Sequence, residues 1–251
     1  MTDPAAPDPT TAAAAIKAGD VDALAGLLRA TPDLATARIT TRRDGRSEGR
    51  TLLHVATDWP GHLPNVAATI GLLVGAGADV DARFAGFHSE TPLHWAASND
   101  DVAALDALVA AGAELESDGA VIAGGTPLDD AVAFGQWAAA ARLAELGART
   151  AVWHAAALGM LDRVAAHLSG AQPLPARHPW GDPADLPREL DVALWCAASG
   201  GRLDVARLLV ERGADPRWVA PWDGTSIADA ARRGGAPDVV TWLDLTTWGS
   251  P

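Results

Sequence analysis

The sequence "TPLHWAASND" at residues 91–100 returns in altered form along the chain. "TLLHVA" stands at 51–56 and "TPLDDA" at 126–131, and weaker copies begin at residues 10, 150, 192 and 225. Most copies are followed by a polar turn and a second apolar stretch, as in "DVAALDALVAAGAEL" at 101–115. Seven similar units at intervals of 24–42 residues indicate a repeat architecture rather than one irregular domain.

Each unit predicts two short helices. Thr91 is suited to the N-cap of the first helix, and Pro92 to its first turn, where no backbone N–H is needed. The apolar residues of the second stretch recur at helical spacing, and Gly112 is suited to the C-cap that follows. One such unit cannot bury its own apolar face, so we expect the units to stack into an all-α solenoid.

The composition of the chain disfavours several classes of function. The 251 residues have a formal net charge of −13, which disfavours binding to a nucleic-acid backbone or to an anionic membrane surface. One cysteine excludes an internal disulfide, and no apolar run is long enough to cross a membrane. The start of the chain lacks the basic segment of a secretion signal, so we expect a cytoplasmic protein. A group of arginines is interpreted as a solvated basic loop: Arg42, Arg43, Arg46 and Arg50.

The recurring T-P-L-H-x-A motif, with its "GAD" ending, resembles the ankyrin repeat. The resemblance implies an ankyrin-type solenoid of about seven repeats over residues 10–243, with irregular central and terminal copies. It leaves a disordered segment at 1–9 and a tail at 244–251. It also implies that His94, and His54 likewise, hydrogen-bonds within and between repeats. Ankyrin repeats usually bind proteins, through a concave groove of hairpin fingers and inner helices.

Departures from the repeat pattern are where we expect function to be specified. The segment "TDWPGHLPN" at 57–65 adds five residues between two helices, and "ARFAGFHSE" at 82–90 is a slightly extended finger rich in aromatic residues. The proline-rich loop at 171–190 is either a lid, with Trp180 as its plug, or a mobile connection. The candidate binding residues at groove positions, each with core packing as the alternative interpretation, are Trp59, Phe84, Phe87, His88, Trp95, Ser98, Asn99, Phe134, Trp218 and Trp222.

Two functions remain open at this point. The first is a non-enzymatic module that binds a partner protein, whose surface we expect to be neutral to basic. The second is an aromatic-lined pocket for an apolar small molecule, with Asp58 and His62 as acid and base if it is an enzyme. The histidines lie in separate repeats, without the close spacing of metal ligands, and no glycine-rich phosphate loop is present. We therefore expect neither a metal nor a cofactor.

Overall fold

The computed structural model describes residues 8–43, 45–174 and 189–245, which are mostly helical. The elements in chain order are α1 (Pro9–Ala18), α2 (Val21–Ala30), the 3₁₀ helix η1 (Pro32–Thr36), β1 (Arg38–Arg43), β2 (Arg46–Thr51), α3 (Leu52–Ala56), α4 (Val66–Gly75), α5 (Pro92–Ser98), α6 (Val102–Ala110), α7 (Pro127–Ala133), α8 (Trp137–Glu145), α9 (Val152–Ala157), α10 (Leu161–Leu168), α11 (Glu189–Ser199), α12 (Leu203–Glu211), α13 (Ile227–Arg233) and α14 (Pro237–Leu245).

The α-helices form seven pairs within the described residues, and each pair begins within three residues of a predicted unit start. The predicted all-α architecture of helix pairs is thus confirmed. The chain divides into two compact units, with the boundary between Ala131 and Val132 inside α7. That residues 10–243 form a single solenoid stays a prediction.

The ends and the proline-rich loop fall largely outside the described residues. These are 1–7, from the predicted disordered segment, 175–188, from the predicted lid with Trp180, and 246–251, from the predicted tail. Next to them, α1 already begins at Pro9, and α14 continues to Leu245.

The recurring histidine connects consecutive repeats. The Nδ1 atom of His94 accepts from the backbone N–H of Thr91 at 3.1 Å and lies 2.9 Å from the Thr91 hydroxyl. Its Nε2–H donates to the carbonyl of Gly125 at 3.3 Å, in the next repeat. His54 repeats the arrangement with Thr51 and with the carbonyl of Glu90. Burial lowers the pKa of both histidines to about 4, so both rings are neutral and bonded at both nitrogens at pH 7.

In the fourth repeat an aspartate replaces the histidine. The backbone N–H and the hydroxyl of Thr126 both donate to Oδ2 of Asp129, at 2.5 and 2.7 Å. A carboxylate therefore closes the same turn as the histidine ring does in the repeats before it.

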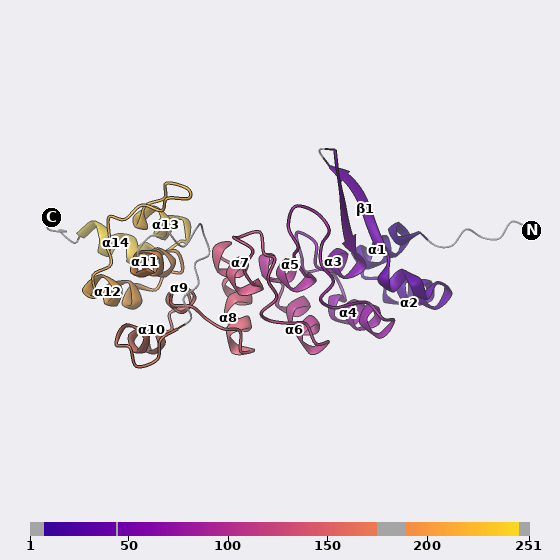
Figure 1. The fold of residues 1–251 in the computed structure, drawn as a ribbon, viewed down its shortest axis with the longest axis horizontal. Coiled ribbons are helices and arrows are strands. Elements are labelled where there is room, and N and C mark those ends of the chain that lie inside the picture. The colour runs from indigo at the N-terminus through magenta and orange to yellow at the C-terminus, as the bar shows by residue number, and fades with distance from the viewer. Residues whose placement is uncertain (1–7, 44, 175–188, 246–251) are drawn as a thin grey trace, which may run out of the picture. The chain divides into compact units, whose positions relative to one another are not determined.

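One finger is longer than the short hairpins that we predicted. Strands β1 and β2 pair antiparallel, with a register that runs from Arg38 opposite Thr51 to Arg43 opposite Arg46. The hairpin projects beyond the helices around it (Figure 1). Its base is tied to the next finger, because Gly49 and Ala85 exchange two backbone hydrogen bonds, of 2.7 and 2.9 Å. The two fingers are therefore held at a fixed separation.

Candidate functional site

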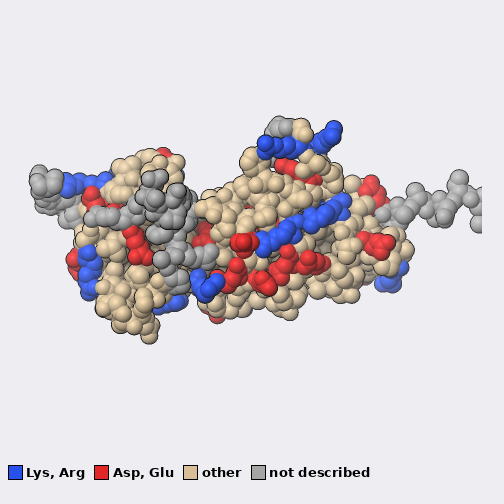
Figure 2. Space-filling view, in the orientation of Figure 1, with Lys and Arg blue, Asp and Glu red and all other residues tan. Residues whose placement is uncertain are grey.

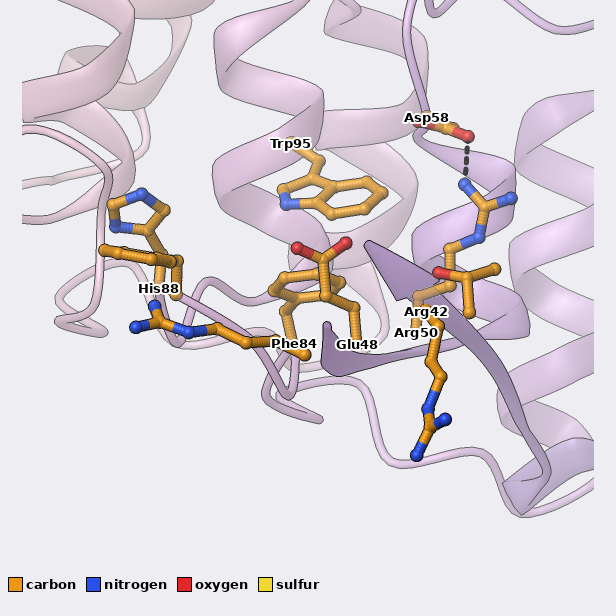
Figure 3. Close-up of a pocket in the computed structure, with 10 residues that line it drawn as sticks. Arg42, Glu48, Arg50, Asp58, Phe84, His88 and Trp95 are labelled. Carbon is orange, nitrogen blue, oxygen red and sulfur yellow. Dashed lines mark hydrogen bonds and ion pairs between the residues drawn. The ribbon is translucent and has the colours of Figure 1, made fainter. Parts of the chain in front are cut away.

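An open groove of about 990 Å³ lies between the two fingers in the first unit. We call it the hairpin groove. Its walls are the β1–β2 hairpin and the finger at 82–90, and its floor comes from α5 and the segment after α3 (Figure 3). The residues that line it are Thr41, Arg42, Arg46, Glu48, Arg50, Asp58, Phe84, Phe87, His88 and Trp95.

The hairpin wall is charged because of strand geometry. Alternate residues of a strand point to the same face, so Arg46, Glu48 and Arg50 of β2 all face the groove. Arg50 is neutralised there, since its Nη1 lies 2.5 Å from Oδ2 of Asp58. The dashed line in Figure 3 marks this pair. It joins the base of β2 to the segment after α3.

The opposite wall holds an aromatic cluster. The Phe84 ring lies 5.5 Å from the Trp95 ring and 6.2 Å from His54, between centroids. The Trp95 ring meets His54 edge-on at 4.9 Å. Gly86 makes room for the Phe84 ring, because a Cβ on Gly86 would lie 2.3 Å from its Cε1 atom. These contacts hold the Phe84 ring of the wall and the Trp95 ring of the floor in place.

A buried carboxyl fixes the floor from below. Glu90 is almost fully buried, and its Oε2 accepts from Nε1 of Trp95 at 3.2 Å. Burial raises the pKa of the Glu90 carboxyl, and the bond from Trp95 partly offsets this effect. Because the indole is bonded at its nitrogen and packed on both His54 and Phe84, its orientation is set before any ligand arrives.

The outer part of the groove is exposed. Phe87 is 74% exposed, and the guanidinium carbon of Arg46 lies 4.7 Å from the centre of its ring. This cation–π contact holds the guanidinium over the Phe87 ring. Arg42 and Glu48 have no charged partner within the described part of the chain. Figure 2 shows basic side chains gathered at the projecting end of the hairpin. The outer groove thus presents the exposed Phe87 ring together with the charges of Arg42 and Glu48.

The structure brings five of the predicted site residues into this groove: Asp58, Phe84, Phe87, His88 and Trp95. Trp59 does not line it, although it follows Asp58 directly and is 81% exposed. Asn99 donates from Nδ2 to the carbonyl of Thr57 at 2.8 Å, so its amide joins two repeats. Ser98 at the end of α5 is half-buried and also lies outside the lining of the groove.

The predicted acid and base have different partners. Asp58 pairs with Arg50 in the groove. His62 does not line the groove; its backbone N–H donates to Oδ2 of the buried Asp101 at 2.6 Å, and its ring nitrogen lies 3.9 Å from the other oxygen. The two side chains are therefore each engaged elsewhere and do not form a common acid–base pair.

The remaining predicted residues belong to the second unit. Phe134 is half-exposed beside a recess of about 330 Å³, which Trp137, Trp195 and Arg233 also line. The Trp222 ring packs against Trp195 at 5.6 Å and against Trp218 at 5.5 Å. Phe134 therefore lies at this recess, and Trp218 and Trp222 pack in a cluster with Trp195, which also lines the recess.

Sequence reasoning missed the hairpin residues of the site. The arginines were interpreted as a solvated loop, whereas Arg42, Arg46 and Arg50 line the groove together with Thr41 and Glu48. A signal was present. Asp44-Gly45 is a frequent turn dipeptide between strands, and "RITTRR" and "RSEGRT" flank it symmetrically. Gly45 has the positive φ, 78°, that such a turn requires.

Comparison with known proteins confirms the predicted ankyrin-type solenoid fold. Residues 88–117 in the first unit and 190–219 in the second each match a family model described as an ankyrin repeat. The two matches thus identify ankyrin repeats in both compact units of the chain. A solved structure of the human ASB11 ankyrin repeat domain is 22% identical, with a TM-score of 0.53, and the match covers 96% of this chain and 98% of that one. No curated protein matches the sequence.

Ankyrin repeats are in general modules for protein–protein interaction. None of the helices in the described residues is long and apolar enough to cross a membrane. Within the same residues, no three His, Cys, Asp or Glu side chains are grouped in the way that metal ligands are.

Proposed function

We propose that the first unit binds a segment of a partner protein in the hairpin groove. The observation that supports this most directly is the exposed Phe87 at the mouth of a groove whose floor is already ordered. Covering an aromatic side chain that is 74% exposed makes a favourable contribution to the free energy of binding. A floor that is already ordered loses little conformational entropy on binding. Trp59, beside the groove, supplies a second exposed ring that a larger partner would cover.

The groove is open and its lining follows β2 from Arg46 to Arg50, which suits an extended polypeptide. The alternative of an apolar small molecule with acid–base chemistry has no observation in its favour among the described residues. Asp58 is paired with Arg50, and His62 lies beside Asp101. The proposal is therefore limited to protein binding.

The test is a selection of peptides from a displayed random library on the immobilised protein. The enriched peptides are then titrated against the parent protein, Phe87→Ala and Phe134→Ala. Burying a phenylalanine contributes roughly 1.5–3 kcal/mol, so Phe87→Ala should weaken binding by about tenfold or more without lowering the melting temperature. Phe134→Ala is the matched control, since it removes a half-exposed ring from the second unit. Peptides that bind Phe87→Ala as tightly as the parent would contradict the proposal.

A further inference from the structure

The charges on β2 indicate what kind of peptide the hairpin groove selects. Arg46, Glu48 and Arg50 face the groove in order, but Arg50 is already paired with Asp58. Arg46 and Glu48 are left as adjacent charges of opposite sign that have no ionic partner among the described residues. Along β2, a partner that enters the groove therefore meets Arg46 and Glu48 as one positive and one negative group, two residues apart.

The two groups differ in how firmly they are placed. The guanidinium of Arg46 rests on the Phe87 ring, at 4.7 Å from its centre, so its planar donors are held in place for a carboxylate. Glu48 is half-buried and extends from the strand toward the Trp95 and Phe84 rings (Figure 3). A cation that pairs with Glu48 would also approach these rings, which attract positive charge through their faces.

The spacing of the two charges fits an extended chain. Residues two apart on a strand are separated by roughly 6.6–7 Å, and an extended partner segment repeats its side chains with the same period. The hairpin is fixed at its base by the two hydrogen bonds between Gly49 and Ala85, so this spacing is built into the wall.

Resting on the function proposed above, we infer that the groove selects an extended peptide with one acidic and one basic side chain two residues apart. The acidic group pairs with Arg46, and the basic group pairs with Glu48 above the aromatic floor. The pattern discriminates against peptides in which the two charges are exchanged, because each would then face its own sign.

The experiment exchanges the charges on both sides. A peptide from the selection and its charge-exchanged version, in which the acidic and basic residues trade places, are titrated against the parent protein and against the double variant Arg46→Glu/Glu48→Arg. The parent protein should prefer the selected peptide by about tenfold, and the double variant should prefer the exchanged peptide. An amidated version of the selected peptide separates a side-chain carboxylate from the C-terminal carboxylate as the acidic group.

The control keeps the net charge and exchanges a pair elsewhere. Arg142 and Glu145 form an exposed pair at 3.1 Å in α8, and Arg142→Glu/Glu145→Arg should leave both preferences unchanged. If both proteins prefer the same peptide, or if the enriched peptides lack the charge pair, this inference is wrong. Their sensitivity to Phe87→Ala then decides separately whether the groove binds peptides at all.

Discussion

Asp130 provides a sharp test of the energetics of this fold. It takes the place in "TPLDD" that Trp95 has in "TPLHW", and it is completely buried at the start of α7. Its Oδ1 accepts from the backbone N–H of Ile122 at 3.3 Å, whereas Oδ2 has no hydrogen-bond partner among the described residues. Burial, together with the nearby carboxyl of Glu90, raises the pKa of Asp130 from 3.8 to about 8. The folded protein therefore keeps this carboxyl protonated at pH 7.

The raised pKa makes stability depend on pH in a definite direction. Between pH 4 and 8 the unfolded chain releases the proton while the folded chain retains it, so the free energy of unfolding falls as the pH rises. Each pKa unit corresponds to ~1.4 kcal/mol, and a shift from 3.8 to about 8 gives a loss on the order of 5 kcal/mol at pH 8 and above. Below pH 4 both states are protonated, and the loss disappears.

Asp130→Asn keeps the shape and the acceptor atom but removes the ionisable group. The variant should match the parent at pH 4 and exceed it in stability by an amount that grows to about 5 kcal/mol at pH 8. Urea unfolding followed by circular dichroism at pH 4, 6, 7 and 8 measures this difference. Asp22→Asn, at an exposed position of α2, should change stability by less than ~0.5 kcal/mol throughout. A difference between Asp130→Asn and the parent that does not vary with pH would refute the reasoning.

Three further outcomes follow from the contacts described above. His94→Ala should lower the free energy of unfolding by about 1–3 kcal/mol at pH 7. The difference in stability between this variant and the parent should shrink as the pH falls from 6.5 to about 4, because the lowered pKa of His94 removes the stabilising contribution of its ring in that range. Urea unfolding at several pH values checks both. Gly86→Ala should destabilise the protein by about 1–3 kcal/mol, since the new Cβ would overlap the Phe84 ring. Gly71→Ala, in an open position of α4, should instead stabilise it by about 0.5–1 kcal/mol. Both effects are measured as shifts of the urea midpoint. A double-mutant cycle on Arg50 and Asp58 should give a coupling of only ~0.2–1 kcal/mol, because both side chains are partly exposed, and a value above ~3 kcal/mol would show that the pair is desolvated.

The helices could be predicted from the sequence because their starts depend on local chemistry. A threonine and a histidine or aspartate three positions after it close one turn, and this pattern is visible without knowing the fold. The resemblance to the ankyrin repeat also implied that His94 bonds between repeats, and its bond to the carbonyl of Gly125 is such a contact. The repeat therefore predicted both the elements and the contacts between neighbours.

The groove could be predicted only in part. Its aromatic wall follows from the finger sequence at 82–90, but its charged wall depends on Gly49 pairing with Ala85, a contact between residues 36 apart. The repeat period does not encode that contact. Phe134 and Trp222 were predicted with Trp95 as groove residues because all are aromatic; they belong to the second compact unit, and a binding role for them stays a prediction. Residue type and repeat position were insufficient where the long-range pairing of backbone segments determines the site.

Charge acts on two length scales in this protein, and the sequence revealed only the longer one. The net charge of −13 governs approach from a distance, and on that basis a neutral or basic partner is favoured. Contact inside the groove is governed by the few charges within roughly 8–10 Å, since salt screens the rest. There Arg46 and Glu48 lie two residues apart on β2. Arg46 attracts an acidic group at short range, although the net charge of the whole chain repels such a group. A basic or neutral protein that presents a single carboxylate beside a cation satisfies both requirements, because its overall charge aids the encounter and its local pair fixes the register in the groove.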